Sequence, residues 1–452
     1  MTIICPAEAA VERLNAGVIA RVLPAPILDG ALGIAPRARR RRKLPDRFML
    51  LFCVLMGFYA DTALPHVLRR IIGPQAAGAD GATAGALCQA RYRLGARPVV
   101  ALFRAACRPL AIPTTPGAFL FGRRLMALDG TTIELPDTPA NVSVFGRRRT
   151  PRGTSAWPQA LLVLLVECGT RAVCDAGVWP GQADERRAGR RLLRSVGPGI
   201  LLLWDRGFQN VAMVEATQAR GADFLGRLPA TVTPLLVRAL SDGTALARLR
   251  ASDYPRRRHG AHVVVRLIRY TLDDPQRPGH RVEHRLVTSL HDPAAAPARE
   301  LILAYHRRWE IESALDELKT HQRPARPLRS RKPVGVVQEL YGLLIAHYLV
   351  RAAIGEAATE ADVSPLRLSF TGALRLLRDH LPLAQHLGAR AYRRLARQLR
   401  QSVAAQRLPR RAERSNPRVV KQKMSNFRVK TAKHRRWPQP TKPFAEAIVL
   451  LI

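Results

Sequence analysis

The chain has 452 residues, which at roughly 150 residues per domain predicts about three domains with ample material for a core. Its 73 Lys and Arg outnumber its 34 Asp and Glu, and the formal net charge is +39. Such a charge favours a polyanionic partner, above all nucleic acid. A hydrophobic share of 47% excludes a chain that is disordered throughout.

Further features of the sequence favour a cytoplasmic location. The longest apolar run, residues 48–60, is shorter than the ~20 residues of a membrane span, so no membrane partner is expected. The first residues show no basic region followed by an apolar stretch, and the six cysteines form no Cys-x-x-Cys pair. We therefore expect reduced thiols and no zinc knuckle.

Residues 1–120 are predicted to be helical. Asp46 is expected to cap a helix over residues 47–59, and residues 85–111 predict two helices broken at Gly95. The pair is either a helix-turn-helix that lies against DNA or a plain helical hairpin, and spacing alone leaves both open. The run 37–43 holds six cations in seven residues and is either a solvated loop or a phosphate clamp.

From Arg123 the pattern changes to short β-type runs, which predict an antiparallel meander over residues 123–180. A polar helix is expected over 183–196 and a strand buried on both faces over 200–205, with sequence ILLLWD. A further helix and strand follow by residue 228. Three strands, helix, strand, helix, strand is the order of a ribonuclease H-like core, a mixed-sheet fold of the α+β or α/β class.

The predicted organisation has four regions. These are a helical N-terminal DNA-binding domain (1–120), a catalytic domain (121–228 with 298–357), a β-rich insertion (229–297) and a helical C-terminal region with a basic tail (358–452). Residues 407–443 hold thirteen Lys and Arg, one acid and five prolines. This stretch is interpreted as a mobile tail or as an arm that follows the surface.

Two aspartates follow predicted strands. Asp129 precedes Gly130 at the edge of a strand, and Asp205 ends the most apolar one. An unpaired buried charge costs several kcal/mol, whereas two carboxylates on neighbouring strands can share divalent cations such as Mg²⁺ or Mn²⁺. Taken singly, Asp129 could instead form a turn, and Asp205 could cap the next helix.

A third candidate carboxylate lies in the stretch 305–319. Tyr305, Arg308, Glu312 and Lys319 are separated by three, four and seven residues, so on one α-helix they fall within roughly 60° of each other. That face could complete a metal site and bind phosphate. The alternative is a surface helix with ion pairs between Asp316 and Lys319 and between Arg308 and Glu312.

The spacing Tyr305-x₂-Arg308-x₃-Glu312-x₆-Lys319 resembles the YREK motif of the DDE transposases of the bacterial insertion sequence 4 family. The segments LDGTT at Asp129 and LLLWDRGF at Asp205 resemble the two aspartate motifs of that family. The N-terminal stretch ALCQARYRLGARPVVALFRAA is similar to its N-terminal domain. The resemblance runs from about residue 12 to about residue 357.

The resemblance implies a ribonuclease H-like domain in which Asp129, Asp205 and Glu312 bind two Mg²⁺ ions, with Mn²⁺ as a substitute. Water and then a DNA 3′-hydroxyl would attack phosphodiesters at the terminal inverted repeats and in the target, as in cut-and-paste transposition. Tyr305, Arg308 and Lys319 would contact DNA phosphates. The implied partners are double-stranded DNA and a second copy of the chain in a synaptic complex, in the nucleoid-associated cytoplasm.

Other classes of function remain to be weighed. A catalytically inactive, transposase-derived DNA-binding protein is disfavoured because all three acids are intact. A metal-dependent nuclease without strand transfer is disfavoured by the basic N-terminal region and the long insertion. A serine hydrolase and a P-loop enzyme find no support, since neither G-x-S-x-G nor a P-loop motif occurs. His280 and His284 do not have the spacing of zinc ligands in a strand.

Overall fold

A computed structural model describes residues 17–34, 43–72, 82–150, 153–251, 260–323, 326–384, 387–409 and 432–451. The chain forms two compact units. The first comprises Met1–Pro116, Gly130–Ala183 and Glu312–Leu408, and the second comprises Gly117–Asp129, Asp184–Ile311 and Pro409–Ile452. The four predicted regions follow chain order instead, and that division stays a prediction.

The described N-terminal residues are helical, as predicted. The helices are α2 (Gly17–Val22), α3 (Ala25–Leu32), α4 (Asp46–Phe58), α5 (Leu64–Ile72), α6 (Ala84–Leu94) and α7 (Arg97–Ala106). The expected cap at Asp46 is wrong, because α4 begins at Asp46 itself and Pro45 before it is extended. Asp46 is instead a residue of the first turn of α4, where its negative charge interacts favourably with the helix dipole. Most of the basic run 37–43 lies outside the described residues.

The predicted break at Gly95 is confirmed. Gly95 ends α6 with φ of 76°, a conformation that suits glycine, and its N–H donates to the carbonyl of Arg91. Thr83 caps the start of α6 by accepting from the N–H of Ala86 at 3.2 Å. The two helices thus form a hairpin, and the helix-turn-helix interpretation stays a prediction.

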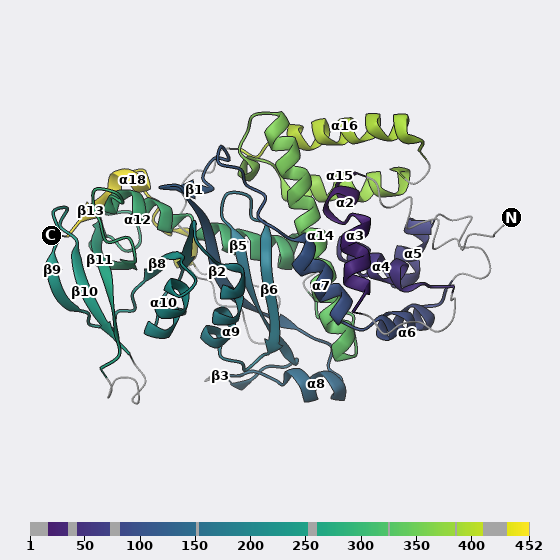
Figure 1. Ribbon diagram of the computed structural model, residues 1–452, viewed down its shortest axis with the longest axis horizontal. Coiled ribbons are helices and arrows are strands. Elements are labelled where there is room, and N and C mark those ends of the chain that lie inside the picture. Colours follow the sequence, from purple (N-terminus) through teal and green to yellow (C-terminus); the bar gives the residue numbers. More distant parts are fainter. Residues whose placement is uncertain are drawn as a thin grey trace. The chain divides into compact units, whose positions relative to one another are not determined.

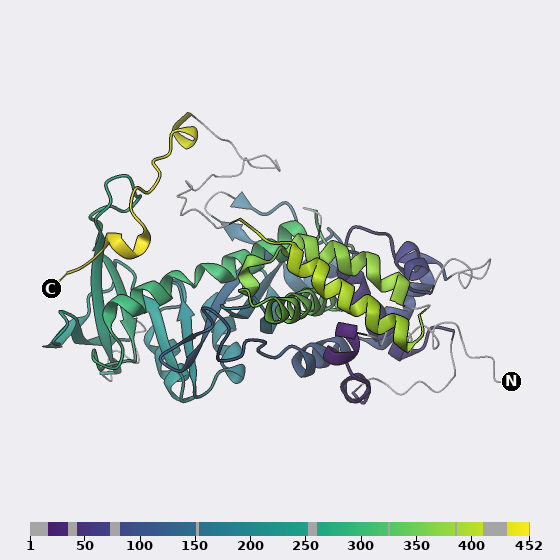
Figure 2. The same ribbon diagram turned by 90° about the horizontal axis from the view of Figure 1, so that it is seen from above.

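The long helix α14 (Pro333–Glu360) forms the core of the first unit. It packs on α4, α7, α15 (Phe370–Ala384) and α16 (Ala389–Ala405), and Figure 2 shows the last two side by side. By length and apolarity α14 could cross a membrane, but 83% of its most apolar window is buried inside the protein, as in a core helix. A Cβ on Gly342 would lie 2.1 Å from the carbonyl oxygen of Cys53, so glycine allows α14 and α4 to touch.

In the first unit the large sheet contributes β6 (Val173–Pro180), β5 (Gln159–Glu167) and the second half of β2 (Arg123–Glu134), in that order. β5 and β6 are antiparallel, as the meander predicted. The helix α8 (Pro139–Phe145) and the short pair β3 (Arg149–Thr150) and β4 (Gly153–Thr154) lie between β2 and β5 in the chain. β2 is one continuous strand, so the turn expected at Gly130 is wrong.

The second unit contains a mixed sheet (Figure 1). The first half of β2 pairs in parallel with β7 (Ile200–Trp204), which pairs in parallel with β8 (Asp223–Arg227). Antiparallel strands continue the sheet: β12 (His284–Thr288), β11 (His262–Leu272), β10 (Ala245–Arg250) and β9 (Leu235–Ala239). β13 (Ile448–Leu450) pairs with β11, and β1 (Phe119–Leu120) with β2.

Beyond the meander predicted over residues 123–180, helical crossovers make β7 and β8 parallel to β2. The crossovers are α9 (Glu185–Leu192) with the 3₁₀ turn η1 (Leu193–Ser195), and α10 (Val211–Gln218). Both helices were predicted, and their first turns are capped by the side chains of Asp184 and Asn210. A mixed sheet with helices fits the predicted ribonuclease H-like fold.

The single helix expected for the stretch 305–319 is divided. It consists of α12 (Ala298–His306), α13 (Trp309–Asp316) and a π-helical turn η2 (Glu317–His321). Between α12 and α13 the chain tightens to three-residue hydrogen bonds, from the N–H of Arg308 to Tyr305 at 3.0 Å and from Ile311 to Arg308 at 3.1 Å. The prediction that Tyr305, Arg308, Glu312 and Lys319 share one face of a regular helix is therefore wrong.

The C-terminal region begins with the 3₁₀ turn η3 (Pro365–Arg367), α15 and α16. Residues 410–431 of the predicted basic tail lie outside the described residues. After them come α17 (Ala432–Arg435) and α18 (Phe444–Ala447). Asp274 accepts hydrogen bonds from the N–H and hydroxyl of Thr441 at 2.9 and 2.8 Å, so this end of the chain follows the surface of the second unit.

Candidate active site

The second unit brings two of the predicted acids together. Leu128 on β2 is in register with Trp204 on β7, so the next residues, Asp129 and Asp205, are neighbours across parallel strands. Residues in register point to the same face of a sheet, and both aspartates are half-buried. The expectation that they occupy neighbouring strands is confirmed.

The turn after β7 fixes Asp205. The N–H of Gly207 donates to Oδ1 of Asp205 at 2.8 Å, and a Cβ at Gly207 would lie 3.0 Å from that oxygen. Arg186 on α9 donates from Nε to the carbonyl of Gly207 at 2.8 Å, which stabilises the same turn. The alternative role for Asp205 as the cap of the next helix is wrong, because Asn210 caps α10.

Apolar packing holds the strand that carries Asp205. Trp204 is fully buried, stacks on Phe224 with ring centres 5.0 Å apart, and donates from Nε1 to Gln209 at 2.8 Å. On α9, a Cβ at Gly189 would lie 2.7 Å from the ring of Phe208, so the glycine lets this helix approach the turn closely. The aspartate is thereby placed on a rigid element, as a functional group requires.

Tyr305 and Arg308 belong to the same unit as the two aspartates. Burial raises the pKa of Tyr305 to about 12, Arg308 and Arg227 oppose the rise, and the charge of Asp205 adds to it. The guanidinium carbon of Arg308 lies 5.9 Å from the centre of the Tyr305 ring. Tyr305 is thus a neutral hydroxyl in the electrostatic neighbourhood of Asp205, with Arg308 beside it.

Arg227 is a site residue that the sequence analysis missed. Gly226 on β8 is in register with Trp204, so Arg227 is the neighbour of Asp205 on the other side from Asp129. Its Nη2 lies 3.1 Å from Nδ1 of His284, whose pKa is lowered to about 4 by burial and by Arg227. Only the pairing of β7 with β8 could have revealed this arginine.

Glu312 and Lys319 belong to the first unit. Glu312 is half-buried on α13, and Lys319 in the π-helical turn donates from Nζ to the hydroxyl of Thr131 at 2.8 Å. Thr131 follows Asp129 by two residues on β2, and alternate residues of a strand share a face. The last residue of the motif therefore lies against the strand that carries the first aspartate.

Within the residues that the structure describes, no group of three or more His, Cys, Asp or Glu could hold a metal ion. The structure thus pairs Asp129 with Asp205, and the approach of Glu312 stays a prediction. His280 Nδ1 lies 3.1 Å from the carbonyl oxygen of Leu272, and His284 Nδ1 lies 3.1 Å from Nη2 of Arg227.

Comparisons with known proteins identify the family. The model described as "Transposase DDE domain" matches residues 120–349, more than half of the chain, and one described as "Insertion element 4 transposase N-terminal" matches residues 13–104. "Transposase InsG for insertion sequence element IS4" of Escherichia coli (strain K12) is 29% identical over 411 residues, or 89% of this chain and 88% of that protein. The chain belongs to the DDE transposases of the insertion sequence 4 family.

The chain is an enzyme of DNA transposition that breaks and rejoins DNA phosphodiester bonds, and DDE transposases use divalent metal ions and bind DNA. The resemblance predicted from the three acidic motifs is confirmed, and the alternative of an inactive DNA-binding protein is not favoured. A cryo-EM structure of the piggyBac transposase synaptic complex with hairpin DNA matches 88% of this chain and 86% of that chain, at 11% identity and a TM-score of 0.40.

Proposed function

We propose that the chain cleaves DNA at terminal inverted repeats and transfers the freed 3′-hydroxyl to a target, with Asp129, Asp205 and Glu312 as its metal ligands. The observation that carries this proposal is the in-register placement of Asp129 beside Asp205. Two half-buried carboxylates on one face of a sheet repel each other, and a divalent cation that they bound would remove that repulsion.

The donor set fits a hard cation. Asp129 and Asp205 offer carboxylate oxygens, the ligands that Mg²⁺ and Mn²⁺ prefer. When bound, a pair of such ions makes water or a 3′-hydroxyl nucleophilic and neutralises the charge on the phosphate under attack. We propose two Mg²⁺ ions, with Mn²⁺ as a substitute. The N–H of Gly207 holds Oδ1 of Asp205 in place.

Glu312 is proposed as the third ligand. Lys319 lies seven residues after Glu312 and contacts Thr131, which shares a strand face with Asp129. The segment from α13 to the π-helical turn is thereby anchored to β2 at its far end. We propose that the carboxylate of Glu312, seven residues before that anchor, completes the site of Asp129 and Asp205.

The neighbouring polar side chains are proposed to hold the DNA strand. Tyr305 keeps its proton, so it can donate a hydrogen bond to a phosphate oxygen near Asp205. Arg308 and Arg227 bring guanidinium groups to the same neighbourhood, and Lys319 brings an ammonium group to β2. These groups would keep the scissile phosphate in line with the attacking oxygen.

The wider assignments are also proposals. The substrate is double-stranded DNA at the element ends and in the target, and two ends held together imply a homodimer in a synaptic complex. We assign residues 1–120 to DNA binding, 121–228 with 298–357 to catalysis and 229–297 to an insertion, with 358–452 as a helical and basic C-terminal region. A DNA substrate places the enzyme in the nucleoid-associated cytoplasm.

The test is cleavage of a DNA duplex that carries the inverted repeats flanking the gene. Wild type should cut only with Mg²⁺ or Mn²⁺ and join the 3′ end to a second duplex, whereas Glu312→Gln should do neither. Asp316→Asn on the same helix is the matched control, because its carboxylate is exposed and pairs with His321 at 3.3 Å. Equal activity of Glu312→Gln and wild type would remove Glu312 from the site. Cutting without joining would favour a nuclease.

A further inference from the structure

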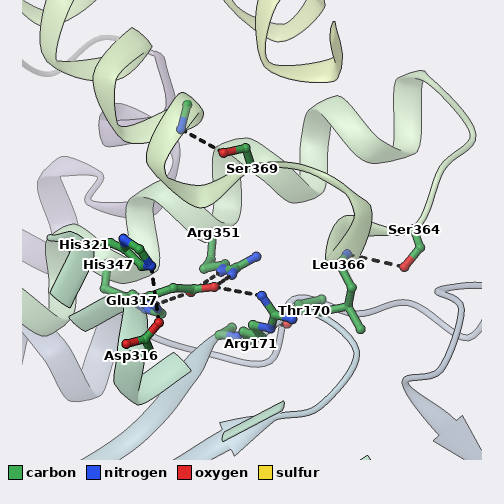
Figure 3. A network of polar contacts seen from close by, with 12 residues as sticks. Thr170, Arg171, Asp316, Glu317, His321, His347, Arg351, Ser364, Leu366 and Ser369 are labelled. Carbon is green, nitrogen blue, oxygen red and sulfur yellow. Dashed lines mark hydrogen bonds and ion pairs between the residues drawn. The ribbon is translucent and has the colours of Figure 1, made fainter. Parts of the chain in front are cut away.

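A buried carboxylate lies two residues before Lys319. The side chain of Glu317 accepts hydrogen bonds from Nη1 of Arg171 at 2.9 Å, from Nε of Arg351 at 2.9 Å and from Nε2 of His347 at 3.1 Å (Figure 3). Arg351 also donates a second bond from Nη2. We call these four residues the Glu317 cluster. All of them are buried and lie within the first unit.

The neighbouring charges and hydrogen bonds keep Glu317 ionised. Burial alone would raise the pKa of Glu317, but Arg351, the hydrogen bond from His347 and the charge of Arg171 hold it well below its usual range. Burial lowers the pKa of His347, so this ring is a neutral donor near pH 7. A fully buried ion cluster is not needed for stability alone, since well-packed apolar side chains of similar volume often stabilise as well or better. Its distinctive property is a fixed geometry.

The π-helical turn connects this cluster to the functional segment. The N–H of Gln322 donates to the carbonyl of Glu317 at 2.8 Å, which closes a five-residue turn. The side chain of Gln322 then donates to the carbonyls of Leu343 at 2.9 Å and of Gly57 at 3.2 Å. The turn is therefore held at both ends, by the Glu317 cluster and by Gln322. Such turns are rare and occur often at functional sites.

Lys319 occupies the middle of this doubly held turn. Its ammonium group meets the hydroxyl of Thr131 on β2, while Glu317 points into the helical core around α14. The two side chains are separated by a single residue, so a displacement of Glu317 must move the backbone of Lys319. The Lys319 ammonium is among the groups proposed to bind a DNA phosphate.

We propose that Glu317 is a positioning residue of the transposition reaction, which holds Lys319 against β2 through the π-helical turn. This inference rests on the proposed function of Lys319. Arg171, His347 and Arg351 supply the fixed frame, from the β5–β6 connection and from α14. A merely structural Glu317 would affect folding and would act independently of Lys319.

A double-mutant cycle separates these two roles. Glu317→Gln keeps the size of the side chain and removes its charge, and Lys319→Ala removes the positioned group. Glu317→Gln should lower the cleavage rate at saturating DNA by about 10- to 100-fold, the scale of a displacement near 1 Å, with little change in the DNA concentration at half-maximal rate. In the Lys319→Ala background the same change should have no further effect. If the fold-losses in cleavage rate of the two single variants multiply in the double variant, the inference is overturned.

A matched control is available in the same unit. Glu339 on α14 is buried and accepts from Oγ of Ser330 at 2.6 Å and Nε of Arg329 at 3.2 Å. Glu339→Gln should lose stability, yet any loss of rate should multiply with that of Lys319→Ala. A Glu339→Gln loss that also vanishes in that background would overturn the specific role of Glu317.

A second variant keeps the test decisive if Glu317→Gln does not fold. Glu317→Asp retains the charge one methylene shorter, and its cycle with Lys319→Ala should show the same loss of effect. Multiplied losses there would again contradict the inference. If wild type cleaves DNA and the cycles are multiplicative, only the positioning role fails. If wild type does not cleave, the proposed function fails and this inference fails with it.

Discussion

Two carboxylate clusters among the described residues balance their negative charge in different ways. Glu317 is 4% exposed and is surrounded by two guanidinium groups and an imidazole. Asp129 within β2 and Asp205 at the end of β7 are half-buried neighbours, and their like charges repel. The Glu317 cluster contains its own positive charges and is rigid. The repulsion between Asp129 and Asp205 would instead be relieved by cations from the solvent. This contrast agrees with the proposal that the first cluster holds the structure in place and the second binds the catalytic ions.

The largest expected difference is in the response to salt, which should weaken DNA binding strongly and the buried Glu317 cluster only slightly. If six to ten phosphates are contacted, DNA affinity should fall by roughly 10³- to 10⁵-fold between 50 and 200 mM salt. The unfolding free energy should change little, because buried ion pairs are screened much less than exposed ones. Fluorescence anisotropy and urea denaturation in the same buffers measure both quantities. An affinity that does not respond to salt would contradict a binding surface built on the +39 charge.

Removing a charge from the aspartate pair should abolish cleavage with little loss of stability. Asp205→Asn should lower the cleavage rate by about 10³-fold or more, since several kcal/mol of transition-state stabilisation depend on the bound ions. Asp273→Asn is the control in the same unit, because its exposed carboxylate pairs with Lys442 at 3.1 Å. A time course of product formation measures both. Similar cleavage rates for Asp205→Asn and Asp273→Asn would contradict a catalytic role for the aspartate pair.

Removing the charge of Glu317 should instead reduce stability strongly. Glu317→Ala leaves Arg171 and Arg351 buried without their shared carboxylate, which should cost about 3–5 kcal/mol of unfolding free energy. The exposed pair of Arg147 with Asp137, 2.7 Å apart, should contribute ~1 kcal/mol or less when Asp137 is changed to Ala. Urea denaturation compares the two variants. Equal losses would show that burial does not distinguish these ion pairs.

Acid should weaken the region around the aspartates gradually. The pKa of His284 is about 4 in the folded chain and 6.5 in a free side chain, so below pH 6.5 the unfolded chain takes up a proton that the folded chain refuses. The contribution of His284 is therefore complete above pH 6.5 and is lost as the pH falls toward 4. His284→Gln should flatten this part of the pH profile of unfolding. An unchanged profile would contradict the buried, neutral ring beside Arg227.

The aspartates could be foreseen because local patterns carry them. An apolar run followed by an acid needs no knowledge of distant residues, and the pairing of β2 with β7 puts the two acids on neighbouring strands as expected, although β2 continues beyond Asp129. The single face expected for Tyr305 to Lys319 assumed a uniform helix. The helix is wound more tightly at Arg308 and more widely at Glu317, which changes the rotation per residue. No local sequence signal marked either change.

Arg227 and the Glu317 cluster were missed for a different reason. Arg227 becomes a neighbour of Asp205 only through the pairing of β7 with β8. Glu317 meets Arg171 across 146 positions of the chain, and each residue alone is typical of a solvated helix or turn. Long-range partners of this kind depend on the tertiary fold, which periodicity and spacing do not encode.

Protein cleavage by a bound metal tests most directly whether the three acids share one site. Fe²⁺ in place of Mg²⁺, followed by ascorbate and peroxide, produces radicals that cut the backbone nearest the ion, and the fragments can be sized by mass spectrometry. We predict cuts near Asp129, Asp205 and Glu312, all of them lost in Asp205→Asn and suppressed by excess Mg²⁺. Cuts near the two aspartates without one near Glu312 would contradict a shared metal site.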